Sequence, residues 1–239
     1  MLWLWLFILS IIFAVIYLIF YPGLGKFDGL FHWTSKKECD NKAIIENKLY
    51  EPIYISLGNK SIEELKVDSK AMKIARSLFV NNCAICHGVD AKGALGFPNL
   101  TNNKWLYGGT ENDIKNTITN GRNGKMPPYG QMLGEKNVEY VAKYVKSLSS
   151  NLENSDELEI GKNKFNTVCT VCHGKDAKGN KFIGAPNLTD PQWIYGGKLD
   201  DIKKTITFGR TGFMPAHKEI LSKNEIHILV AYIFLINNI

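Results

Sequence analysis

The first 21 residues of the sequence carry no charged side chain, and Ser10 is the only small polar residue among them. This run also lacks what a cleaved secretory signal needs: no basic segment precedes it, and no small-x-small cleavage site precedes Pro22 and Gly23. At about 1.5 Å of rise per residue the run spans about 30 Å, which matches the hydrocarbon core of a bilayer. We therefore predict that residues 1–21 form an uncleaved transmembrane helix.

The chain also carries little net charge, and its composition is ordinary. Its 29 basic and 23 acidic residues leave a formal net charge of +6, and no basic run with interleaved aromatic residues occurs, so nucleic-acid binding is not expected. Hydrophobic residues make up 45% and charged residues 22%, which excludes a mainly disordered or collagen-like chain. A length of 239 residues favours two small domains with additional segments.

An internal repeat occupies the remainder of the chain. The motif Cys83-Ala84-Ile85-Cys86-His87 returns as Cys169-Thr170-Val171-Cys172-His173, an offset of 86, and further groups return at an offset of 88. These groups include Pro98-Asn99-Leu100-Thr101 with Pro186-Asn187-Leu188-Thr189, Trp105-x-Tyr107-Gly108-Gly109 with Trp193-x-Tyr195-Gly196-Gly197, and Met126-Pro127 with Met214-Pro215. We predict two tandem domains of one fold, residues 68–150 and 151–239, which a connector at 22–67 joins to the membrane helix.

Apolar residues at helical spacing flank each cysteine motif, so the fold is predicted to be mainly α. One such pattern precedes the first motif and another precedes the second, at Leu158, Gly161 and Phe165. A further helix is predicted after each Met-Pro, although the apolar run that ends at Ile236 is also compatible with a buried strand. In the connector, Glu51-Pro52 argues against one continuous helix.

Each Cys-x-x-Cys-His motif predicts covalent attachment of a haem. The two thiols can form thioethers with the porphyrin vinyl groups, and the adjacent histidine reaches the iron from the same side. Zinc binding and a redox-active disulfide are the alternatives, because Cys-x-x-Cys occurs in both. The adjacent histidine, the wide separation of the motifs and the lack of a second Cys or His pair near either one favour haem. We expect two covalently bound haem c groups, attached at Cys83, Cys86, Cys169 and Cys172, with His87 and His173 as iron ligands.

The sixth iron ligand is expected from a distant point of the sequence, on the far side of the ring. Met126 and Met214 stand 43 and 45 residues after the first cysteine of their copies, each followed by proline in a Gly-rich loop. A thioether favours ferrous iron, so His/Met ligation raises the reduction potential and leaves no open position for a substrate. Met132 is the main rival to Met126 at the first haem, but it has no counterpart in the second copy. The pattern predicts two tandem class I cytochrome c domains behind one transmembrane helix.

Further residues are candidates for supporting roles around the haems. The carbonyl of Pro98 or Pro186 is expected to accept a hydrogen bond from the second ring nitrogen of the adjacent iron-ligating histidine. Two matched sets are expected either to bind the haem propionates or to pack in the aromatic core: Trp105, Tyr107 and Arg122, and Trp193, Tyr195 and Arg210. Solvent or packing roles are expected for His32, His217 and His227, and Cys39 is expected to be an unpaired thiol.

Two signals disagree on which side of the membrane the repeat lies. Lys26, Lys36 and Lys37 follow the span and nothing basic precedes it, which by the positive-inside rule places the repeat in the cytoplasm. The bias is small, because Asp28 and Glu38 are interspersed, whereas attachment of haem c is completed outside the cytoplasmic membrane. We therefore expect a protein of the bacterial inner membrane with its haem domains in the periplasm.

The sequence at the exit of the membrane helix carries a family resemblance. Tyr21-Pro22-Gly23-Leu24-Gly25, then Phe27, Gly29 and Trp33-Thr34-Ser35, followed by the two haem motifs, resemble the dihaem subunit III of cbb3-type cytochrome c oxidase over almost the whole chain. Met214-Pro215-Ala216-His217 and Ile226-His227 are similar to the second domain of that subunit. Members of the family often carry an additional N-terminal span and cytoplasmic segment, so either an upstream segment or a short form is expected here.

The resemblance implies an electron-transfer subunit that does not itself reduce oxygen. Such a subunit accepts electrons from a donor cytochrome c, relays them from haem to haem, and delivers them to the haem-copper catalytic subunit, beside a monohaem cytochrome c subunit of the same respiratory complex. A free-standing, membrane-anchored dihaem carrier for another respiratory complex is the alternative. A dihaem peroxidase is less favoured, because it needs an exchangeable ligand position and both copies retain a candidate methionine.

Overall fold

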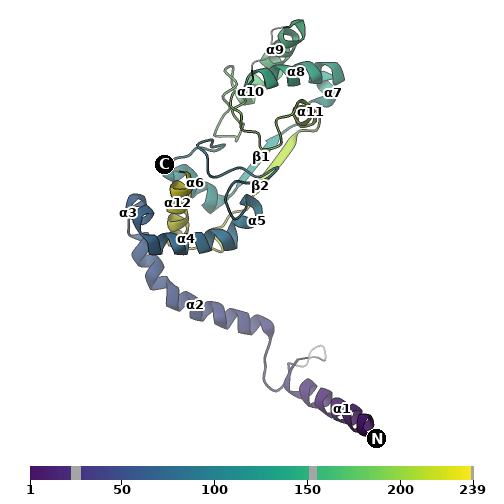
Figure 1. The fold of residues 1–239 in the computed structure, drawn as a ribbon, viewed down its shortest axis with the longest axis vertical. Helices are drawn as coiled ribbons and strands as arrows, with labels where there is room; N and C mark the ends of the chain where they lie inside the picture. The colour runs from purple at the N-terminus through teal and green to yellow at the C-terminus, as the bar shows by residue number, and fades with distance from the viewer. Residues whose placement is uncertain (23–27, 151–154, 238–239) are drawn as a thin grey trace. The chain divides into compact units, whose positions relative to one another are not determined.

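The computed structural model describes residues 1–22, 28–150 and 155–237. Within these ranges the chain forms twelve helices and two short strands, which is the mainly α fold predicted from the sequence. The chain divides into two compact units, Met1–Ser56 and Leu57–Ile239. Figure 1 shows the elements of both units.

The first unit contains the membrane helix and most of the connector. α1 (Leu2–Phe20) includes an 18-residue window of mean hydropathy 2.7 and has no buried residue, so it is long and apolar enough to cross a membrane. α2 (Ser35–Gly58) runs through Pro52. The connector is not one continuous helix, as predicted, but Pro52 does not interrupt it: the break lies between Gly58 and the start of α3 at Ile62.

The second unit begins with α3 and then repeats most of its elements. Side-chain caps fix where helices begin: the Asp68 carboxylate accepts hydrogen bonds from the peptide N–H groups of Lys70 and Ala71, and the Ser155 hydroxyl accepts one from Leu158. The elements that precede the second copy are α3 (Ile62–Val67), α4 (Ser69–Asn82), α5 (Ala84–His87), α6 (Glu111–Asn120), β1 (Arg122–Met126), α7 (Gly130–Leu133) and α8 (Glu135–Ser147). The second copy supplies α9 (Asp156–Val168), α10 (Thr170–His173), α11 (Leu199–Phe208), β2 (Arg210–Met214) and α12 (Lys223–Asn237), and α12 settles the strand-or-helix alternative as a helix.

The two copies exchange their last helices. α12, from the end of the second copy, packs against α3, α4 and α6 of the first, whereas α8, from the end of the first copy, packs against α9 and α11 of the second. We call α3–α6 with α12 the first core, and α7–α8 with α9–α11 the second core. The predicted boundary at 150–151 divides the sequence repeat, but the packed cores each combine helices from both sides of it.

An aromatic pair marks each exchanged contact. The rings of Phe79 on α4 and Tyr232 on α12 lie with centroids 5.4 Å apart, and those of Tyr144 on α8 and Phe165 on α9 lie at the same distance. Phe79 and Phe165 are almost completely buried, at 0% and 1% exposed. Both cores are therefore closed by the same kind of contact, and in each one the tyrosine comes from the other copy.

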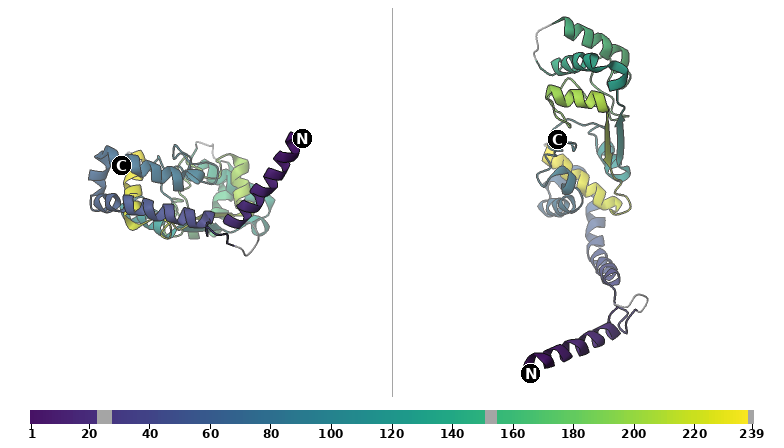
Figure 2. Two further views of the ribbon diagram at one scale, coloured as in Figure 1. Left: turned by 90° about the horizontal axis from the view of Figure 1, so that it is seen from below. Right: turned by 90° about the vertical axis from the view of Figure 1, so that its right-hand side faces the viewer.

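The chain crosses between the cores along β1 and β2, which pair as an antiparallel ribbon. Gly124 lies opposite Gly212, its equivalent in the repeat, so the register is symmetric about this pair. At one end Arg122 lies opposite Met214, and at the other Met126 lies opposite Arg210. Figure 2 (right view) shows the ribbon linking the two groups of helices.

Two glycines make the crossing possible. Gly121 and Gly209 precede the two strands with φ angles of +68° and +70°, in the left-handed region that favours glycine. A Cβ on Gly121 would lie 2.3 Å from the carbonyl oxygen of Met214, and one on Gly209 would lie 2.3 Å from that of Met126. Each glycine thus permits the close approach of the segment that follows the methionine of the other copy.

Candidate haem sites

Each Cys-x-x-Cys-His motif forms a single helical turn that presents its histidine to the interior. α5 and α10 end in His87 and His173, which are 9% and 8% exposed. Nδ1 of His87 lies 3.1 Å from the carbonyl oxygen of Pro98, and Nδ1 of His173 lies 3.1 Å from that of Pro186. These are the hydrogen bonds predicted from the sequence. With Nδ1–H donating to a carbonyl, the lone pair of Nε2 is left for a metal ion.

Burial shifts the pKa values of the thiols and of the imidazoles in these motifs. It raises the pKa of Cys83 and of Cys169 to about 11, with a smaller contribution from the second thiol of each motif. It also lowers the pKa of His87 and of His173, which favours the neutral imidazole, the form that binds iron.

Met126 lies in the second core. Its side chain packs against the buried cluster that includes Val141 and Phe165. Three residues later, the peptide N–H of Tyr129 donates to the carbonyl of Ile206 on α11 (2.9 Å). Burial raises the pKa of the Tyr129 hydroxyl, and the nearby thiols of the second motif add to the shift. The fold therefore places Met126 with the second cysteine motif.

Met214 occupies the equivalent place beside the first core. Three residues later, the peptide N–H of His217 donates to the carbonyl of Ile118 on α6 (3.0 Å), which repeats the Tyr129 contact. The His217 side chain is 6% exposed and close enough to His87 to contribute, after burial, to the lowering of the His87 pKa. Sequence spacing pairs each methionine with the cysteine motif upstream of it. The structure places each beside the other motif, because the chain crosses over at the ribbon.

The fold also determines the position of Met132, the alternative to Met126 as an iron ligand. Met132 lies on α7, which packs against α8 and α11 in the second core, and its side chain is 61% exposed. Neither its position nor its exposure suits a ligand of the first haem. A solvent or packing role was expected for His227. Its Nε2 donates a hydrogen bond to the carbonyl of Lys60 (2.8 Å), which is a structural contact.

Two arginines lie at the ends of the ribbon in matching environments. The Arg122 guanidinium lies over the ring of Tyr107, and that of Arg210 lies over the ring of Tyr195, each at 4.6 Å from the centroid. Nε donates to the hydroxyl of Thr117 (2.9 Å) in one case and of Thr205 (3.0 Å) in the other. Neither guanidinium pairs with a carboxylate within the described part of the chain, so both are suited to bind carboxylates of a bound group.

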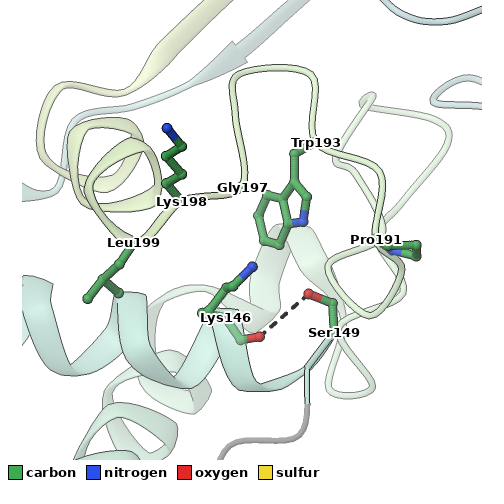
Figure 3. Close-up of a pocket in the computed structure, with 7 residues that line it drawn as sticks. All are labelled: Lys146, Ser149, Pro191, Trp193, Gly197, Lys198 and Leu199. Carbon is green, nitrogen blue, oxygen red and sulfur yellow. Dashed lines mark hydrogen bonds between the residues drawn. The ribbon is translucent and has the colours of Figure 1, made fainter.

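The two predicted tryptophans pack close to glycine backbone. A Cβ on Gly109 would lie 2.2 Å from Trp105, and one on Gly197 would lie 2.5 Å from Trp193. Trp193 also packs against the second core and lines a cavity of about 570 Å³, whose other walls include Lys146 on α8 (Figure 3). The structure thus gives both tryptophans a packing role, and it is compatible with a further contact to a bound group.

Several supporting residues of the sites were not predicted from the sequence. Tyr129 and His217 were not identified as members of the sites, although each stands three residues after its methionine. Thr117 and Thr205, which orient the arginines, recur at the same offset of 88 as the rest of the repeat. A full alignment of the two copies would have found the two threonines, whereas Tyr129 and His217 align with each other but differ in residue type.

The residues present fit a bound haem. Among the residues that the structure describes, no three His, Cys, Asp or Glu side chains gather to form a metal site on their own. A haem iron would take its remaining donors from the porphyrin and a thioether. Nδ1 of His217 is buried and has no hydrogen-bond partner within the described ranges. An orphaned buried nitrogen is costly, and it indicates a site that is completed by another group.

Comparison with known proteins agrees with this geometry. The family model for cytochrome c oxidase, cbb3-type, subunit III matches residues 70–145 and 156–233, and that for the N-terminal domain of cytochrome oxidase-cbb3, FixP, matches residues 2–28. The cbb3-type cytochrome c oxidase subunit CcoP of Rubrivivax gelatinosus is 45% identical over 97% of this chain and 76% of its own length. The subunit FixP of Azorhizobium caulinodans is 36% identical over 97% of this chain and 85% of its own length.

These matches cover both copies of the repeat and the membrane helix with its exit. They favour a subunit of an oxidase over a free-standing carrier, and they agree with the resemblance seen in the sequence. The chain belongs to the family of subunit III of cbb3-type cytochrome c oxidase, the membrane-anchored dihaem cytochrome c subunit that relays electrons within that enzyme.

Proposed function

We propose that this chain holds two haem c groups with crossed ligands. One haem would be held by Cys83, Cys86, His87 and Met214, and the other would be held by Cys169, Cys172, His173 and Met126. The observation that carries the proposal is the packing of Met126 in the second core, with the Tyr129 N–H bonded to Ile206. When bound, each haem supplies a one-electron redox couple, and the thioether ligand favours its ferrous form.

The chain's own residues hold and orient these groups. The carbonyls of Pro98 and Pro186 fix the histidine rings, and burial favours the neutral form of those rings. Arg122 and Arg210 have further guanidinium N–H groups with which to bind the propionates of the first and second haem. Tyr107 and Tyr195 hold the arginines in place through ring contacts.

The ribbon sets the separation of the two sites. Arg122 with Met214 marks one end and Met126 with Arg210 the other, four residues apart along the strands, which is about 14 Å. Each strand joins a propionate-binding arginine of one site to the iron-ligating methionine of the other. This arrangement supports a relay of single electrons between two closely held haems.

The orientation and the partners are part of the same proposal. The haem domains lie in the periplasm, because haem c attachment is completed there, and α1 anchors them to the inner membrane. The chain accepts electrons from a donor cytochrome c and passes them to the haem-copper catalytic subunit, beside the monohaem cytochrome c subunit. The Rubrivivax gelatinosus and Azorhizobium caulinodans relatives are named as subunits of a cbb3-type oxidase, which supports these partners.

Counting covalent haems tests the proposal directly. The intact mass of the full chain, with a pyridine haemochrome assay, should give two haems per chain. The pair Cys83→Ala and Cys86→Ala should remove one haem, and the pair Cys169→Ala and Cys172→Ala should remove the other. A colourless chain, or one that binds zinc in place of haem iron, would contradict the proposal.

Cys39 provides a probe of orientation. It is exposed on α2, outside both haem motifs, and it is not in a disulfide. A membrane-impermeant maleimide added to intact spheroplasts should label it if the repeat is periplasmic. A Cys39→Ser chain is the control, and labelling that requires lysis would place the repeat in the cytoplasm.

A further inference from the structure

Residues 29–31 lie against the end of the membrane helix. The peptide N–H of Leu30 donates to the carbonyl of Ile19 (3.0 Å), and that of Phe31 donates to Phe20 (3.1 Å). Gly29 allows this close approach, since a Cβ there would lie 2.5 Å from the Phe20 carbonyl oxygen. Residues 29–31 are thus held against the last turn of α1.

Aromatic contacts extend this attachment. The rings of Phe20 and Phe31 stack with centroids 4.8 Å apart, and Trp33 meets Tyr21 edge-on at 5.8 Å. Aromatic side chains at the end of a membrane span favour the headgroup layer. Phe31 and Trp33 are nevertheless 60% and 40% exposed. They present apolar surface beside the end of the span.

A cavity of about 260 Å³ lies between this segment and the first turns of α2. Phe31, Trp33 and Ile45 form apolar walls, and Lys37, Glu38 and Lys42 bring charge to its rim. The cavity is built entirely within the unit Met1–Ser56. It combines an apolar lining with charged side chains next to the end of a membrane helix.

The charges at the rim are not equivalent. Glu38 accepts a hydrogen bond from Trp33 Nε1 (3.0 Å) and pairs with Lys42 (2.8 Å). The hydrogen bonds from Lys42 and Trp33 hold the pKa of Glu38 below its usual range, so the carboxylate stays ionised and neutralises Lys42. The Lys37 ammonium has no acidic partner among the residues described. One positive charge is therefore left at an otherwise balanced rim.

We propose that this cavity binds an anionic phospholipid from the leaflet next to the soluble part of the chain. The Lys37 ammonium meets the phosphodiester, and the apolar walls cover the start of the acyl chains. Lysines beside a membrane surface attract anionic lipid in this way. The occupant is a lipid and not a soluble anion, because the lining is mainly apolar and the cavity adjoins the residues that end the span.

Lipid retention can be measured by native mass spectrometry on the full, haem-loaded chain released from detergent. Phosphatidylglycerol should bind to the wild-type chain more tightly than phosphatidylcholine. Lys37→Gln should weaken phosphatidylglycerol binding about fivefold, the effect of one surface lysine. The neighbouring Lys36 does not line the cavity, so Lys36→Gln should change binding less than about twofold and is the matched control.

Three outcomes would overturn the proposal. Equal losses in the Lys36 and Lys37 variants would indicate diffuse surface charge. Equal binding of the two lipids would remove the role of the lysine. Displacement of phosphatidylglycerol by an equal concentration of inorganic phosphate would make a soluble anion the ligand. Haem content and the visible spectrum should stay unchanged in both variants, so a failure here would leave the haem proposal intact.

Discussion

Tyr232 packs on Phe79, although 153 residues separate them and they belong to different copies of the repeat. The equivalent contact, Tyr144 on Phe165, runs in the opposite direction between the copies. Both contacts depend on the crossing of the chain at β1 and β2. Each core is therefore stabilised by side chains that the other copy provides.

A double-mutant cycle tests this exchange. We expect Phe79→Leu and Tyr232→Leu to be coupled by about 0.5–1.5 kcal/mol, the usual interaction of an aromatic pair. Phe79→Leu and Tyr144→Leu should be additive within about 0.5 kcal/mol, although Tyr144 is the tyrosine of the same copy. Denaturant unfolding of the full chain in detergent measures both. Coupling to Tyr144 instead of Tyr232 would show that each copy closes on itself.

Crossed ligation predicts which haem responds to each methionine. Met126→His should lower the reduction potential of the haem attached at Cys169 and Cys172 and leave the first unchanged, because imidazole favours ferric iron more than a thioether does. Met214→His should do the opposite. Spectroscopic redox titration measures the shifts. Variants that lack one cysteine pair identify which haem has moved, and a shift of the haem in the same copy would contradict the crossing.

The glycines at the crossing should not tolerate a side chain. Gly121→Ala combines a left-handed φ with a close approach to the Met214 carbonyl, so we expect it to cost more than about 1–3 kcal/mol and to disturb the first haem site. Gly134 has a similar φ of +73°, but a Cβ there would meet no atom of the described residues within 4 Å, so Gly134→Ala isolates the backbone strain. Denaturant unfolding and visible spectra distinguish the two variants. Equal effects would mean that Gly121 does not approach the Met214 carbonyl closely.

The start of α4 gives a pH dependence of known sign. Hydrogen bonds from Lys60, Ala71 and Lys70 lower the pKa of Asp68 to about 2, from its ordinary value near 4. A lowered carboxyl pKa stabilises the fold fully above about pH 4, and this contribution is lost as the pH falls through about 2. The difference in melting temperature between wild type and Asp68→Asn should therefore shrink from about pH 5 to about pH 2.5. A constant difference would show that the charge of Asp68 contributes nothing.

Much of this fold can be predicted from local sequence. The span, the helices before each motif and the hydrogen bonds from His87 to Pro98 and from His173 to Pro186 follow from hydropathy, spacing and the repeat. The break in the connector was expected at Pro52, but α2 continues through this proline to Gly58. Local patterns identify the helices around each motif correctly.

The sequence does not predict which core the last helix of each copy joins. Tyr144 and Tyr232 occupy equivalent positions, and either could pack on Phe79 or on Phe165, because the two cores are nearly alike. The choice depends on the path of β1 and β2, which is a property of tertiary structure. The methionine pairing follows from that choice, so spacing alone assigns Met126 to the first site, whereas the fold places it beside the second.

The exchanged helices make the two copies inseparable. A gene fragment that encodes residues 68–150 alone would supply α4 without α12 and α8 without α9, so it would leave two incomplete cores. The duplication that produced this chain cannot be undone by simple truncation, and neither copy can be moved to another protein as a working single-haem module.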